Sequence, residues 1–321
     1  MKVLITGGAG FIGSHFARMA SKGDFDGITE IRVLDKFTYS GLTSNLESLH
    51  SSSKYELVIG DITNPMDVER ACKGVNAVIN FAAESHVDRS ISDSSAFINT
   101  NIEGVRVLLE QCRQLNIRFL QVSTDEVYGS ISSGSWSEDS PLEPNSPYSA
   151  SKASADLLVR SFNKTYGLDT IVTRCSNNYG PNQFPEKVIP LFITNLIGGE
   201  LVPIYGNGQN VRDWLHVTDH CRGIALALEK GKKGEIYNLG GGQELSNLDL
   251  TLKILDQFGF GTEKIRYVKD RMGHDMRYSV DWQKAREQLG YFPTVSFSDG
   301  LSETIRWYRD NPKWWKLLKT K

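Results

Sequence analysis

The chain has little of several features that would narrow its class at once. It has four cysteines, Cys72, Cys112, Cys175 and Cys221, and they are scattered without a CxxC pair. This pattern favours reduced thiols that fill helices or strands over a disulfide framework or a catalytic cysteine. No apolar run is long enough to span a membrane, and the N-terminus leads directly into a strand-like segment without a signal-peptide layout. We therefore expect a cytoplasmic protein with no membrane partner.

Charge of one sign is not in excess either. The sequence has 36 basic and 38 acidic residues, which leaves a net charge of -2. This balance gives no electrostatic support to nucleic acid as the main partner. With 321 residues, 40% hydrophobic and 23% charged, the chain has the composition of one large or two modest globular domains. No internal repeat or low-complexity segment is present.

The first half of the chain alternates between strand-like and helical segments. An apolar strand is predicted over 2–6 and is followed by helical spacing over 14–22. Further strands are predicted over 31–35, 55–59, 77–81, 118–122 and 169–173, and helices over 96–115 and 148–166. This order predicts an α/β fold, a Rossmann-like doubly wound parallel sheet.

After residue 176 the regular alternation fades. Short strands are predicted over 201–205, 211–215 and 235–239, and helices over 187–197, 217–229, 248–258, 283–289 and 297–308. We expect a first domain over 1–176, to which later segments return, and a smaller mixed α/β C-terminal lobe over 177–321.

Three glycines follow the first predicted strand. Gly7, Gly10 and Gly13 have the spacing GxxGxxG between a strand and a helix. Glycine permits a tight turn and a close approach of the backbone to a pyrophosphate, and a helix N-terminus attracts its charge. Asp35 ends the next strand at about the 20-residue spacing of a ribose-binding acid, and a carboxylate there would repel a 2′-phosphate. NAD is favoured over NADP, although Lys36 weakens this preference. Asp61 ends the third strand, either as an adenine ligand or as a cap of the next turn.

The stretch from Ser123 to Lys152 carries the candidate chemistry. A strand ends at Thr124, Asp125 and Glu126, and a helix begins with Tyr148 and Lys152. The lysine lies one helical turn beyond the tyrosine, where its charge is expected to lower the phenol pKa and make it a base. The two acids can divide acid and base roles if their surroundings separate their pKa values. The alternative is that Tyr148 and Lys152 are ordinary surface residues at the start of a helix.

Several other polar residues have a structural as well as a functional interpretation. Glu84 either orients a neighbour or is a loop acid, and His86 is expected to be structural. Asp213 is expected to pair with Arg212 and fix it. His216 and His220 have i,i+4 spacing without a third ligand nearby, so no metal site is predicted.

Trp307, Trp314 and Trp315 lie among lysines near the C-terminus. A final helix that packs its aromatic side chains, followed by a frayed basic tail, is favoured over an amphipathic membrane segment.

With these pieces in place, the chain resembles the extended short-chain dehydrogenase/reductase family over nearly its whole length. Within that family it is similar to the nucleotide-sugar 4,6-dehydratases, most of all to those that act on dTDP-glucose. The motifs that carry the resemblance are Thr124–Gly129, Ala82–Asp88, Asn177–Pro181, Arg212–Trp214 and Gly273–Asp275. The adjacent pair Asp125 and Glu126 separates this group from related epimerases and decarboxylases. Met272 departs from the family pattern, which usually has proline there.

The resemblance implies a mechanism and an assignment of roles. Tyr148 and Lys152 would take the proton of the sugar 4-hydroxyl while a hydride passes to tightly bound NAD. Glu126 would remove the C5 proton, Asp125 would protonate the leaving 6-hydroxyl, and the hydride would return to C6. Thr124 would hydrogen-bond the 4-oxygen, so the catalytic set is Thr124, Asp125, Glu126, Tyr148 and Lys152.

The resemblance also implies contacts in both regions, an NAD-binding Rossmann domain and a nucleotide-sugar-binding lobe. The cofactor contacts would be Gly7, Gly10, Phe11, Ile12, Gly13, Asp35, Lys36, Phe37, Thr38, Asp61, Ile62, Phe81, Ala82, Ala83, Glu84, Ser85, Thr100, Tyr148, Lys152 and Asn178. The substrate contacts would be Ser85, Thr124, Asn177, Lys187, Val188, Pro203, Ile204, Tyr205, Arg212, Asn247, Asp270, Arg271, Met272, Gly273 and His274. Lys187, Arg212 and Arg271 suit a diphosphate, and Tyr205 suits a nucleobase.

Two rival functions stay open at this point. One is another NAD-dependent nucleotide-sugar enzyme of the same family, an epimerase or a decarboxylase. A more distant rival is a non-enzymatic dinucleotide sensor, which the complete catalytic set argues against. The resemblance further implies a homodimer through the helices over 96–115 and 148–166.

Overall fold

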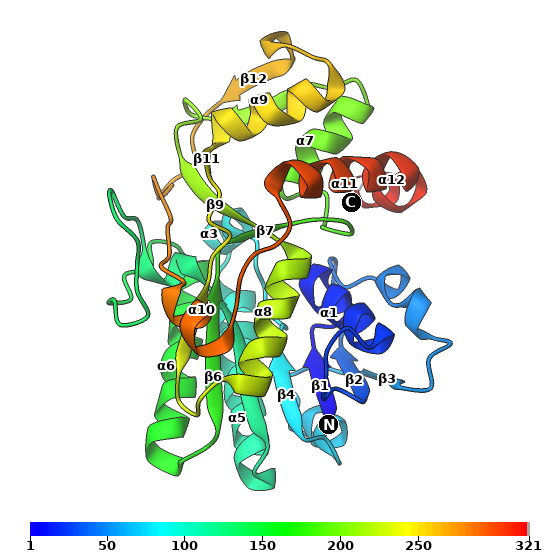
Figure 1. Cartoon of the computed structure of the whole chain (residues 1–321), viewed down its shortest axis with the longest axis vertical. Helices are drawn as coiled ribbons and strands as arrows, with labels where there is room; N and C mark the ends of the chain where they lie inside the picture. Colours follow the sequence, from blue (N-terminus) through cyan, green and yellow to red (C-terminus); the bar gives the residue numbers. More distant parts are fainter. Residues whose placement is uncertain (320–321) are drawn as a thin grey trace.

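The computed structural model describes residues 1–319, and its main feature is a sheet of seven strands (Figure 1). All neighbouring strands run parallel, so the predicted Rossmann-like doubly wound sheet is confirmed. The strand order reverses at β1 and β4, which is where open α/β sheets form a ligand crevice. In spatial order the strands are β10 (Ile236–Leu239), β6 (Thr170–Cys175), β5 (Arg118–Thr124), β4 (Ala77–Asn80), β1 (Lys2–Thr6), β2 (Glu30–Asp35) and β3 (Tyr55–Ile59).

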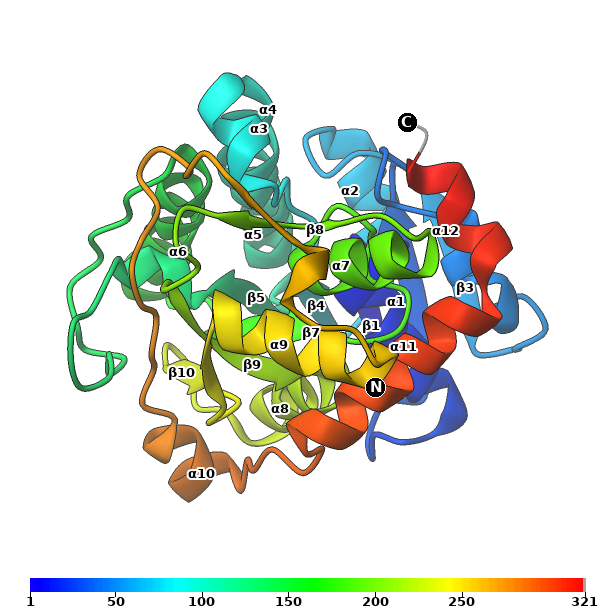
Figure 2. The same ribbon diagram turned by 90° about the horizontal axis from the view of Figure 1, so that it is seen from above.

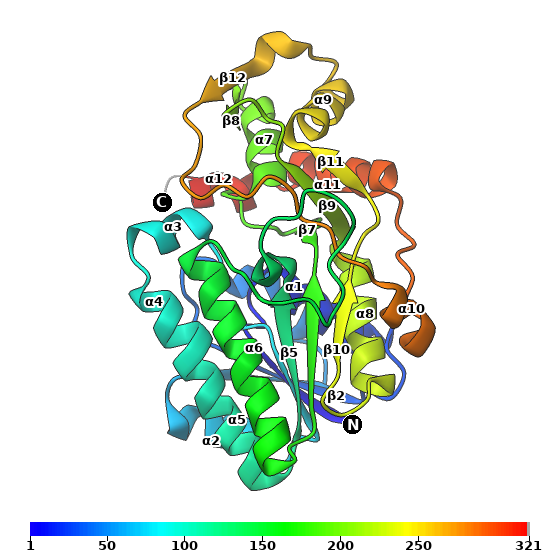
Figure 3. The same ribbon diagram turned by 90° about the vertical axis from the view of Figure 1, so that its left-hand side faces the viewer.

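Helices cover both faces of this sheet, and each face has its own hydrophobic core (Figure 3). In β1, Val3 and Ile5 point into one core and Leu4 into the other, as the two-residue period of a strand requires. Burial on both faces explains why these strands are apolar throughout. The first face carries α1 (Phe11–Lys22), α8 (Val217–Lys230) and α10 (Gln283–Leu289), and the second carries α2 (Pro65–Cys72), α5 (Gly104–Leu115) and α6 (Pro147–Tyr166).

The segment that leads into α5 is not a regular α-helix. Instead of the single helix predicted over 96–115, α3 (Val87–Ser92) and α4 (Ser95–Phe97) are followed by a π-helix over Ile98–Glu103. At the first residue of α5, Gly104, a Cβ would lie 2.5 Å from the Ile62 side chain, so the helix packs closely on the loop after β3. π-helical turns are frequent at functional sites, and this one carries Thr100, which lines the cleft described below.

A smaller lobe with its own core lies beyond the carboxyl ends of the main strands (Figures 1 and 2). It combines a three-stranded sheet, in which β11 is antiparallel to β9, with a two-stranded parallel sheet, so the predicted mixed lobe is confirmed. Its elements are β7 (Asn177–Tyr179), α7 (Val188–Ile197), β8 (Val202–Tyr205), β9 (Val211–His216), β11 (Glu244–Ser246), α9 (Asn247–Phe258), β12 (Ile265–Val268), α11 (Phe297–Asp310) and α12 (Pro312–Lys319). Between β9 and β11 the chain returns to the main sheet through α8 and β10. The domain boundary at residues 176 and 177 stays a prediction.

Short 3₁₀ helices complete the description: η1 (Thr43–Asn45), η2 (Glu47–Leu49), η4 (Asp125–Tyr128) and η5 (Thr262–Lys264).

Most predicted boundaries lie within two residues of the observed ones, and the larger differences have local causes. α1 begins at Phe11 rather than near residue 14, because Gly10 already serves as its N-cap. α2 is absent from the sequence prediction, although Asn64 caps it and Pro65 occupies its first turn, as both residue types commonly do. β5 extends to Thr124, two residues beyond its predicted end.

The C-terminal aromatic residues pack inside the smaller lobe, as predicted. Trp315 is buried in its core, and Trp307 meets Trp314 edge to face with ring centroids 5.0 Å apart. Across residues 1–319, no helix is both long and apolar enough to cross a lipid bilayer. The predicted frayed tail includes residues 320–321, which lie outside the described residues.

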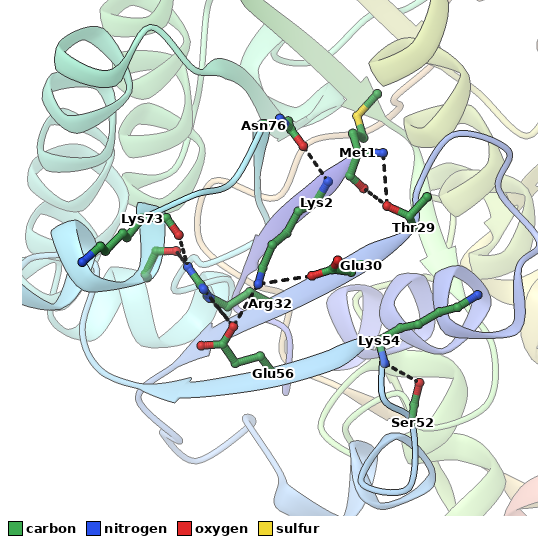
Figure 4. Close-up of polar contacts among 11 residues, drawn as sticks. Met1, Lys2, Thr29, Glu30, Arg32, Ser52, Lys54, Glu56, Lys73 and Asn76 are labelled. Atoms are coloured by element: carbon green, nitrogen blue, oxygen red, sulfur yellow. Dashed lines mark hydrogen bonds and ion pairs between the residues drawn. The ribbon is translucent and has the colours of Figure 1, made fainter.

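At the amino end of the sheet, one nearly buried arginine joins three elements (Figure 4). Arg32 of β2 donates to the carbonyl oxygens of Ala71 and Lys73, both at 2.7 Å, at the C-terminal end of α2. It also donates to Glu56 of β3 at 2.8 Å, and Lys2 of β1 pairs with the same carboxylate at 3.1 Å. These bonds fix β1, β2, β3 and α2 to one another at the edge opposite the cleft.

We predict that Arg32→Met lowers the free energy of unfolding by about 2 kcal/mol, because it leaves two carbonyls without their charged donor and leaves Lys2 as the remaining cation on the Glu56 carboxylate. Urea unfolding at a fixed cofactor concentration measures this loss. The matched control is Arg70→Met, since Arg70 pairs with Asp67 at the surface, where an ion pair contributes about 0–1 kcal/mol. Equal losses for the two variants would contradict the assignment.

Candidate active site

A deep cleft opens at the carboxyl ends of the parallel strands, at the point where the strand order reverses. Its lining comes from the loops after β1 to β5, from the start of α6 and from the segment that follows β6. Residues far apart in the sequence meet here because parallel strands all end at the same edge of a sheet. This position makes the cleft the candidate active site.

The glycine turn after β1 leaves no room for side chains. Gly7 has a φ of +65°, and a Cβ on it would lie 2.6 Å from the Ala82 backbone. A Cβ on Gly13 would lie 2.5 Å from the carbonyl oxygen of Gly7, so α1 packs directly on the turn. The first N–H groups of a helix have no partner within the helix and attract phosphate. With Gly10 as the N-cap of α1, this turn fits the pyrophosphate of a dinucleotide.

Asp35 at the end of β2 is held at the adjacent wall of the cleft. Its carboxylate accepts hydrogen bonds from the backbone N–H groups of Ala9 at 2.9 Å and Phe37 at 2.8 Å. Burial raises the pKa of Asp35, and these two bonds oppose that shift. Lys36 pairs with Asp61 at 3.2 Å, and its charge also opposes the rise of the Asp35 pKa. A carboxylate fixed here fits the ribose of NAD, as predicted.

The end of β4 is fixed by the π-helix. The side chain of Asn101 accepts from the N–H of Glu84 at 2.9 Å and donates to the Glu84 carbonyl at 3.0 Å. The same amide donates to Ser151 Oγ on α6 at 2.8 Å. One buried side chain therefore joins the loop after β4 to the helix that carries Tyr148.

The candidate catalytic residues meet where β5 ends and α6 begins. Thr124 is the last residue of β5, and its Oγ1 lies 3.2 Å from Asp125 Oδ1 and accepts from the Glu126 N–H at 3.3 Å. A capping box formed by Ser146 and Ser149 starts α6 and presents Tyr148 to the cleft that Thr124 also lines. Thr124, Asp125, Glu126, Tyr148 and Lys152 all line this one cleft.

The residues that follow the acid pair support it from behind. Tyr128 is fully buried, donates to Asn238 at 2.8 Å and accepts from Arg174 at 2.8 Å. Arg174 in turn forms a buried ion pair with Asp156 of α6 at 2.9 Å. This network ties η4, β6, β10 and α6 together directly behind the catalytic side chains.

Asp125 and Glu126 have different electrostatic surroundings. Burial, and then the charges of Glu126 and Asp213, raise the pKa of Asp125 well above its ordinary value. Burial also raises the pKa of Glu126, but the positive charges of Arg212, Lys187 and Arg271 oppose that shift. Asp125 is thus the group that keeps a proton, and Glu126 is the group that more readily ionises. The acid and base roles that the sequence leaves open are separated by these neighbours.

One expectation about Tyr148 is wrong. Its pKa is not lowered: burial, and then the charge of Glu126, raise it well above its ordinary value. Lys152 does lie one turn further on, but its ammonium donates to the Val122 carbonyl at 2.7 Å. Burial also lowers the pKa of Lys152. The sequence spacing predicts the position of Lys152 correctly. It does not include the free-energy cost of burying the charged forms of Tyr148 and Lys152.

Four buried polar atoms in the cleft have no hydrogen-bond partner among residues 1–319. They are Ser123 Oγ, Asp125 Oδ2, Asn177 Oδ1 and Gln183 Oε1. Unpaired buried polar atoms are costly, so native structures usually satisfy them with a ligand or water. Together with the glycine turn and Asp35, they show that these residues fit a bound dinucleotide and a polar substrate.

Nearly all predicted cofactor residues line the cleft, and Phe37 is the exception. Its φ of 54° turns the chain after Asp35, and its side chain packs on the first core instead. Asp61 combines both of its proposed roles, since it lines the cleft and accepts from the Thr63 N–H at 2.9 Å.

The predicted substrate residues fall into two groups. Ser85, Thr124, Asn177 and Lys187 line the cleft, and the Lys187 ammonium donates to the Ser85 carbonyl at 2.9 Å. The others lie outside that lining: Val188, Pro203, Ile204, Tyr205, Arg212, Asn247, Asp270, Arg271, Met272, Gly273 and His274.

Several members of the outer group nevertheless contact one another. Arg271 lies 5.4 Å from the centre of the Tyr205 ring, and the Tyr205 and His274 rings are 6.3 Å apart. Arg271 also pairs with Asp88 of α3 at 2.6 Å, which connects the smaller lobe to the first domain.

The polar residues with two interpretations are largely structural. Asp213 does not pair with Arg212 as predicted; it accepts from Ser176 Oγ and from the N–H groups of Gly241 and Gln243 at 2.6–2.7 Å. The Asp213 carboxylate is therefore fully used by the turn after β10, which is why it is not available to the arginine.

The histidines also have structural partners. His86 caps α3, His216 caps α8, and His220 hydrogen-bonds Asn178 at 2.8 Å. In the part of the chain that the structure describes, no three His, Cys, Asp or Glu residues are grouped to hold a metal ion.

The family model described as GDP-mannose 4,6 dehydratase matches residues 4–304 of the chain. The chain belongs to this family. The match confirms the resemblance to extended short-chain dehydrogenases and nucleotide-sugar 4,6-dehydratases.

Similar proteins extend over the whole length. The dTDP-glucose 4,6-dehydratase of Streptomyces niveus is 52% identical over 323 residues, which cover 100% of this chain and 96% of that protein. The solved dTDP-glucose 4,6-dehydratase of Streptomyces venezuelae, with NAD and TYD bound, is 54% identical with a TM-score of 0.98 and covers 99% of this chain and 100% of that one. A UDP-glucuronic acid 4-epimerase from Bacillus cereus, solved with UDP-glucuronic acid and NAD, is 30% identical with a TM-score of 0.90. The match covers 97% of this chain and 99% of that one.

Some cleft residues of this family member are missing from the sequence prediction. Ser40, Gly41, Asn182, Phe184 and Glu186 line the cleft from two loops that carry no motif. The only sequence signal was their position next to predicted residues such as Thr38 and Lys187. Ser123 was named only as the first residue of the stretch from Ser123 to Lys152, and no contact with cofactor or substrate was predicted for it.

We predict that Asp125→Asn changes how stability depends on pH. A carboxyl whose pKa is raised by folding binds more protons in the folded than in the unfolded state, so its contribution to stability falls as the pH rises above its unfolded pKa. Over the pH range in which Asp125 is protonated in the folded but not in the unfolded protein, the free energy of unfolding falls by about 1.4 kcal/mol per pH unit. Wild type should therefore lose stability relative to Asp125→Asn between about pH 4 and its folded pKa.

Urea unfolding at several pH values, with a fixed cofactor concentration, measures this difference. Asp139→Asn, at an exposed position, is the control and should follow wild type. Parallel pH curves for wild type and Asp125→Asn would show that Asp125 ionises normally in the folded protein.

Proposed function

We propose that this protein is a dTDP-glucose 4,6-dehydratase, a hydro-lyase that converts dTDP-glucose to dTDP-4-keto-6-deoxy-glucose with NAD. The observation that carries the proposal is the acid pair, because Asp125 and Glu126 share the cleft with Tyr148, and the pKa of Asp125 is raised well above its ordinary value while three cations oppose the rise at Glu126. The similarity to dTDP-glucose 4,6-dehydratases over the whole chain supports the same function.

The reaction begins at C4 of the sugar. Tyr148, as its phenolate, takes the proton of the 4-hydroxyl, and Thr124 holds the same oxygen. To act as this base Tyr148 must first lose its own phenol proton, and the resulting phenolate needs a nearby cation, which Lys152 one helical turn further on supplies. Bound NAD would supply reversible hydride transfer, with the hydride taken from C4 at the start and returned to C6 at the end.

Elimination then uses the acid pair. The 4-keto group acidifies the neighbouring C5–H bond, and the Glu126 carboxylate removes that proton. Asp125 gives its proton to the 6-hydroxyl, so water leaves and a C5–C6 double bond forms. After the hydride has reached C6, a proton returns to C5, and loss of the proton that Tyr148 accepted, together with reprotonation of Asp125, readies the enzyme for another cycle. The two steps need one ionised and one protonated carboxyl group, which the different surroundings of Asp125 and Glu126 favour.

The substrate diphosphate is proposed to lie among the cations that surround Glu126. Lys187, Arg212 and Arg271 all contribute positive charge there and can donate charge-assisted hydrogen bonds. The nucleobase is proposed to lie near Tyr205 of β8 and His274, whose rings meet edge to face.

We predict that the enzyme incorporates deuterium from heavy water at C5 of the product and transfers the C4 hydrogen of the substrate to C6. Mass spectrometry and proton NMR of the product from dTDP-glucose distinguish both positions. Free reduced cofactor should not accumulate during the conversion, because the hydride is returned. A product without solvent deuterium at C5 would exclude this mechanism.

The nearest rival is an epimerase of the same fold. Epimerisation involves no leaving hydroxyl and so has no use for a protonated Asp125. Asp125→Asn should reduce formation of the keto product by about 10²–10⁴-fold, the usual contribution of a general acid. Bound cofactor should still become reduced in that variant, since oxidation at C4 precedes elimination. Unchanged product formation would instead favour the epimerase.

We further propose a cytoplasmic homodimer with no nucleic-acid or membrane partner. The cytoplasmic location is supported by four buried cysteines that are all unpaired. The dimer is supported by α5 and α6, which pack side by side on the outer face of the sheet (Figure 3). Ile98, Leu115, Leu157 and Tyr166 on these helices are 46–56% exposed, and a four-helix bundle between two copies would cover them.

Leu157→Glu should convert this dimer to a monomer, because it places a charge in an apolar helix interface. Sedimentation velocity measures the change. Leu252→Glu, at an exposed position of α9 in the smaller lobe, is the matched control and should leave the dimer intact. A monomeric wild-type protein would refute the proposed assembly.

A further inference from the structure

Two loops that are distant in the sequence both line the cofactor cleft. Residues 38–42 follow β2, and residues 182–187 lead into α7, and both segments line the same cleft as the glycine turn. The first segment is fixed to that turn, because the Leu42 N–H donates to the Ala9 carbonyl at 3.0 Å. A dinucleotide bound on the glycine turn would therefore lie in the same cleft as both loops.

Glu186 is the residue that holds the two loops together. Its Oε1 accepts from the Tyr39 hydroxyl at 3.0 Å, and its Oε2 accepts from Arg89 of α3 at 3.2 Å. The Arg89 guanidinium also lies 3.7 Å from the centre of the Tyr39 ring. We call these three residues the Tyr39–Arg89–Glu186 cluster. It joins the loop after β2, the helix after β4 and the segment before α7.

Further contacts reinforce the cluster. The ring of Phe184 meets the Tyr39 ring edge to face at 5.4 Å, and His86 Nε2 lies 3.7 Å from Glu186 Oε2. Burial, and then the charge of Glu186, raise the pKa of Tyr39, so its hydroxyl stays a donor. A second link between the loops runs from Asn182 to Asn45 at 3.3 Å.

We propose that the Tyr39–Arg89–Glu186 cluster closes the cleft over NAD and keeps the dinucleotide bound throughout the catalytic cycle. This inference rests on the proposed function, in which a hydride is borrowed from the sugar and returned to it. A reduced cofactor that left in mid-cycle would take the hydride with it and leave an oxidised sugar behind. None of the three contacts takes part in the chemistry, so their role is to slow dissociation.

The measurement is the rate at which bound NAD exchanges with radiolabelled NAD, followed by filtration without any sugar present. Tyr39→Phe keeps the ring but removes the bond to Glu186, and should release NAD about fivefold faster. Arg89→Ala removes a charge-assisted bond and the ring contact, and should release NAD about tenfold faster.

The matched control is Arg309→Ala. Arg309 also lies over an aromatic ring, that of Phe258 at 4.6 Å, but in the smaller lobe away from the cleft. It should exchange NAD at the wild-type rate. Urea unfolding with saturating NAD checks that all three variants are folded.

Wild-type exchange rates in both cluster variants would overturn the proposal, and so would equal acceleration in Arg309→Ala. Because exchange is measured without substrate, its result is independent of which nucleotide sugar the enzyme converts. A failure to form the keto product would count against the proposed function alone.

Discussion

Two adjacent carboxyl groups in one buried cleft cannot ionise alike, and the rest of the site depends on how their surroundings differ. Arg212 lowers the pKa of both groups, but the negative charge of Asp213 raises that of Asp125, whereas Lys187 and Arg271 lower that of Glu126 further. The same burial that raises both pKa values makes these neighbours effective, because charges interact strongly where water is excluded. An acid and a base can thus occupy consecutive positions of one strand end.

The difference between the surroundings of Asp125 and Glu126 serves catalysis only if both side chains are held rigidly in place. The acid pair lies on a short 3₁₀ turn directly after a buried strand, and Tyr128 of that turn is fixed by Asn238 and Arg174. Because Arg174 pairs with Asp156 of α6, one buried network positions both the acids and the helix that carries Tyr148. Asn101 gives a second connection, between the loop after β4 and Ser151. The cofactor loops and the catalytic helix are therefore parts of one hydrogen-bonded unit.

Much of the site was predictable because its residues lie at strand ends and helix starts, which local patterns reveal. The glycine turn, Asp35, the acid pair and Tyr148 with Lys152 all have this placement. The loops that carry Ser40, Phe184 and Glu186 have no such pattern, and only the folded chain brings them into the cleft. The pairing of Asp213 was mispredicted for the same reason, since its donors Gly241 and Gln243 come from a turn some 30 residues away in the sequence.

The sequence by itself determined the parallel sheet, the position of the glycine turn and the positions of the candidate catalytic side chains, because periodicity and spacing act over a few residues. The tertiary structure alone decided the charge states. Burial raises the pKa of Tyr148 although Lys152 is one turn away, and distant cations distinguish Glu126 from Asp125. Desolvation and long-range charge depend on everything that packs around a group, and no local pattern of residues records that.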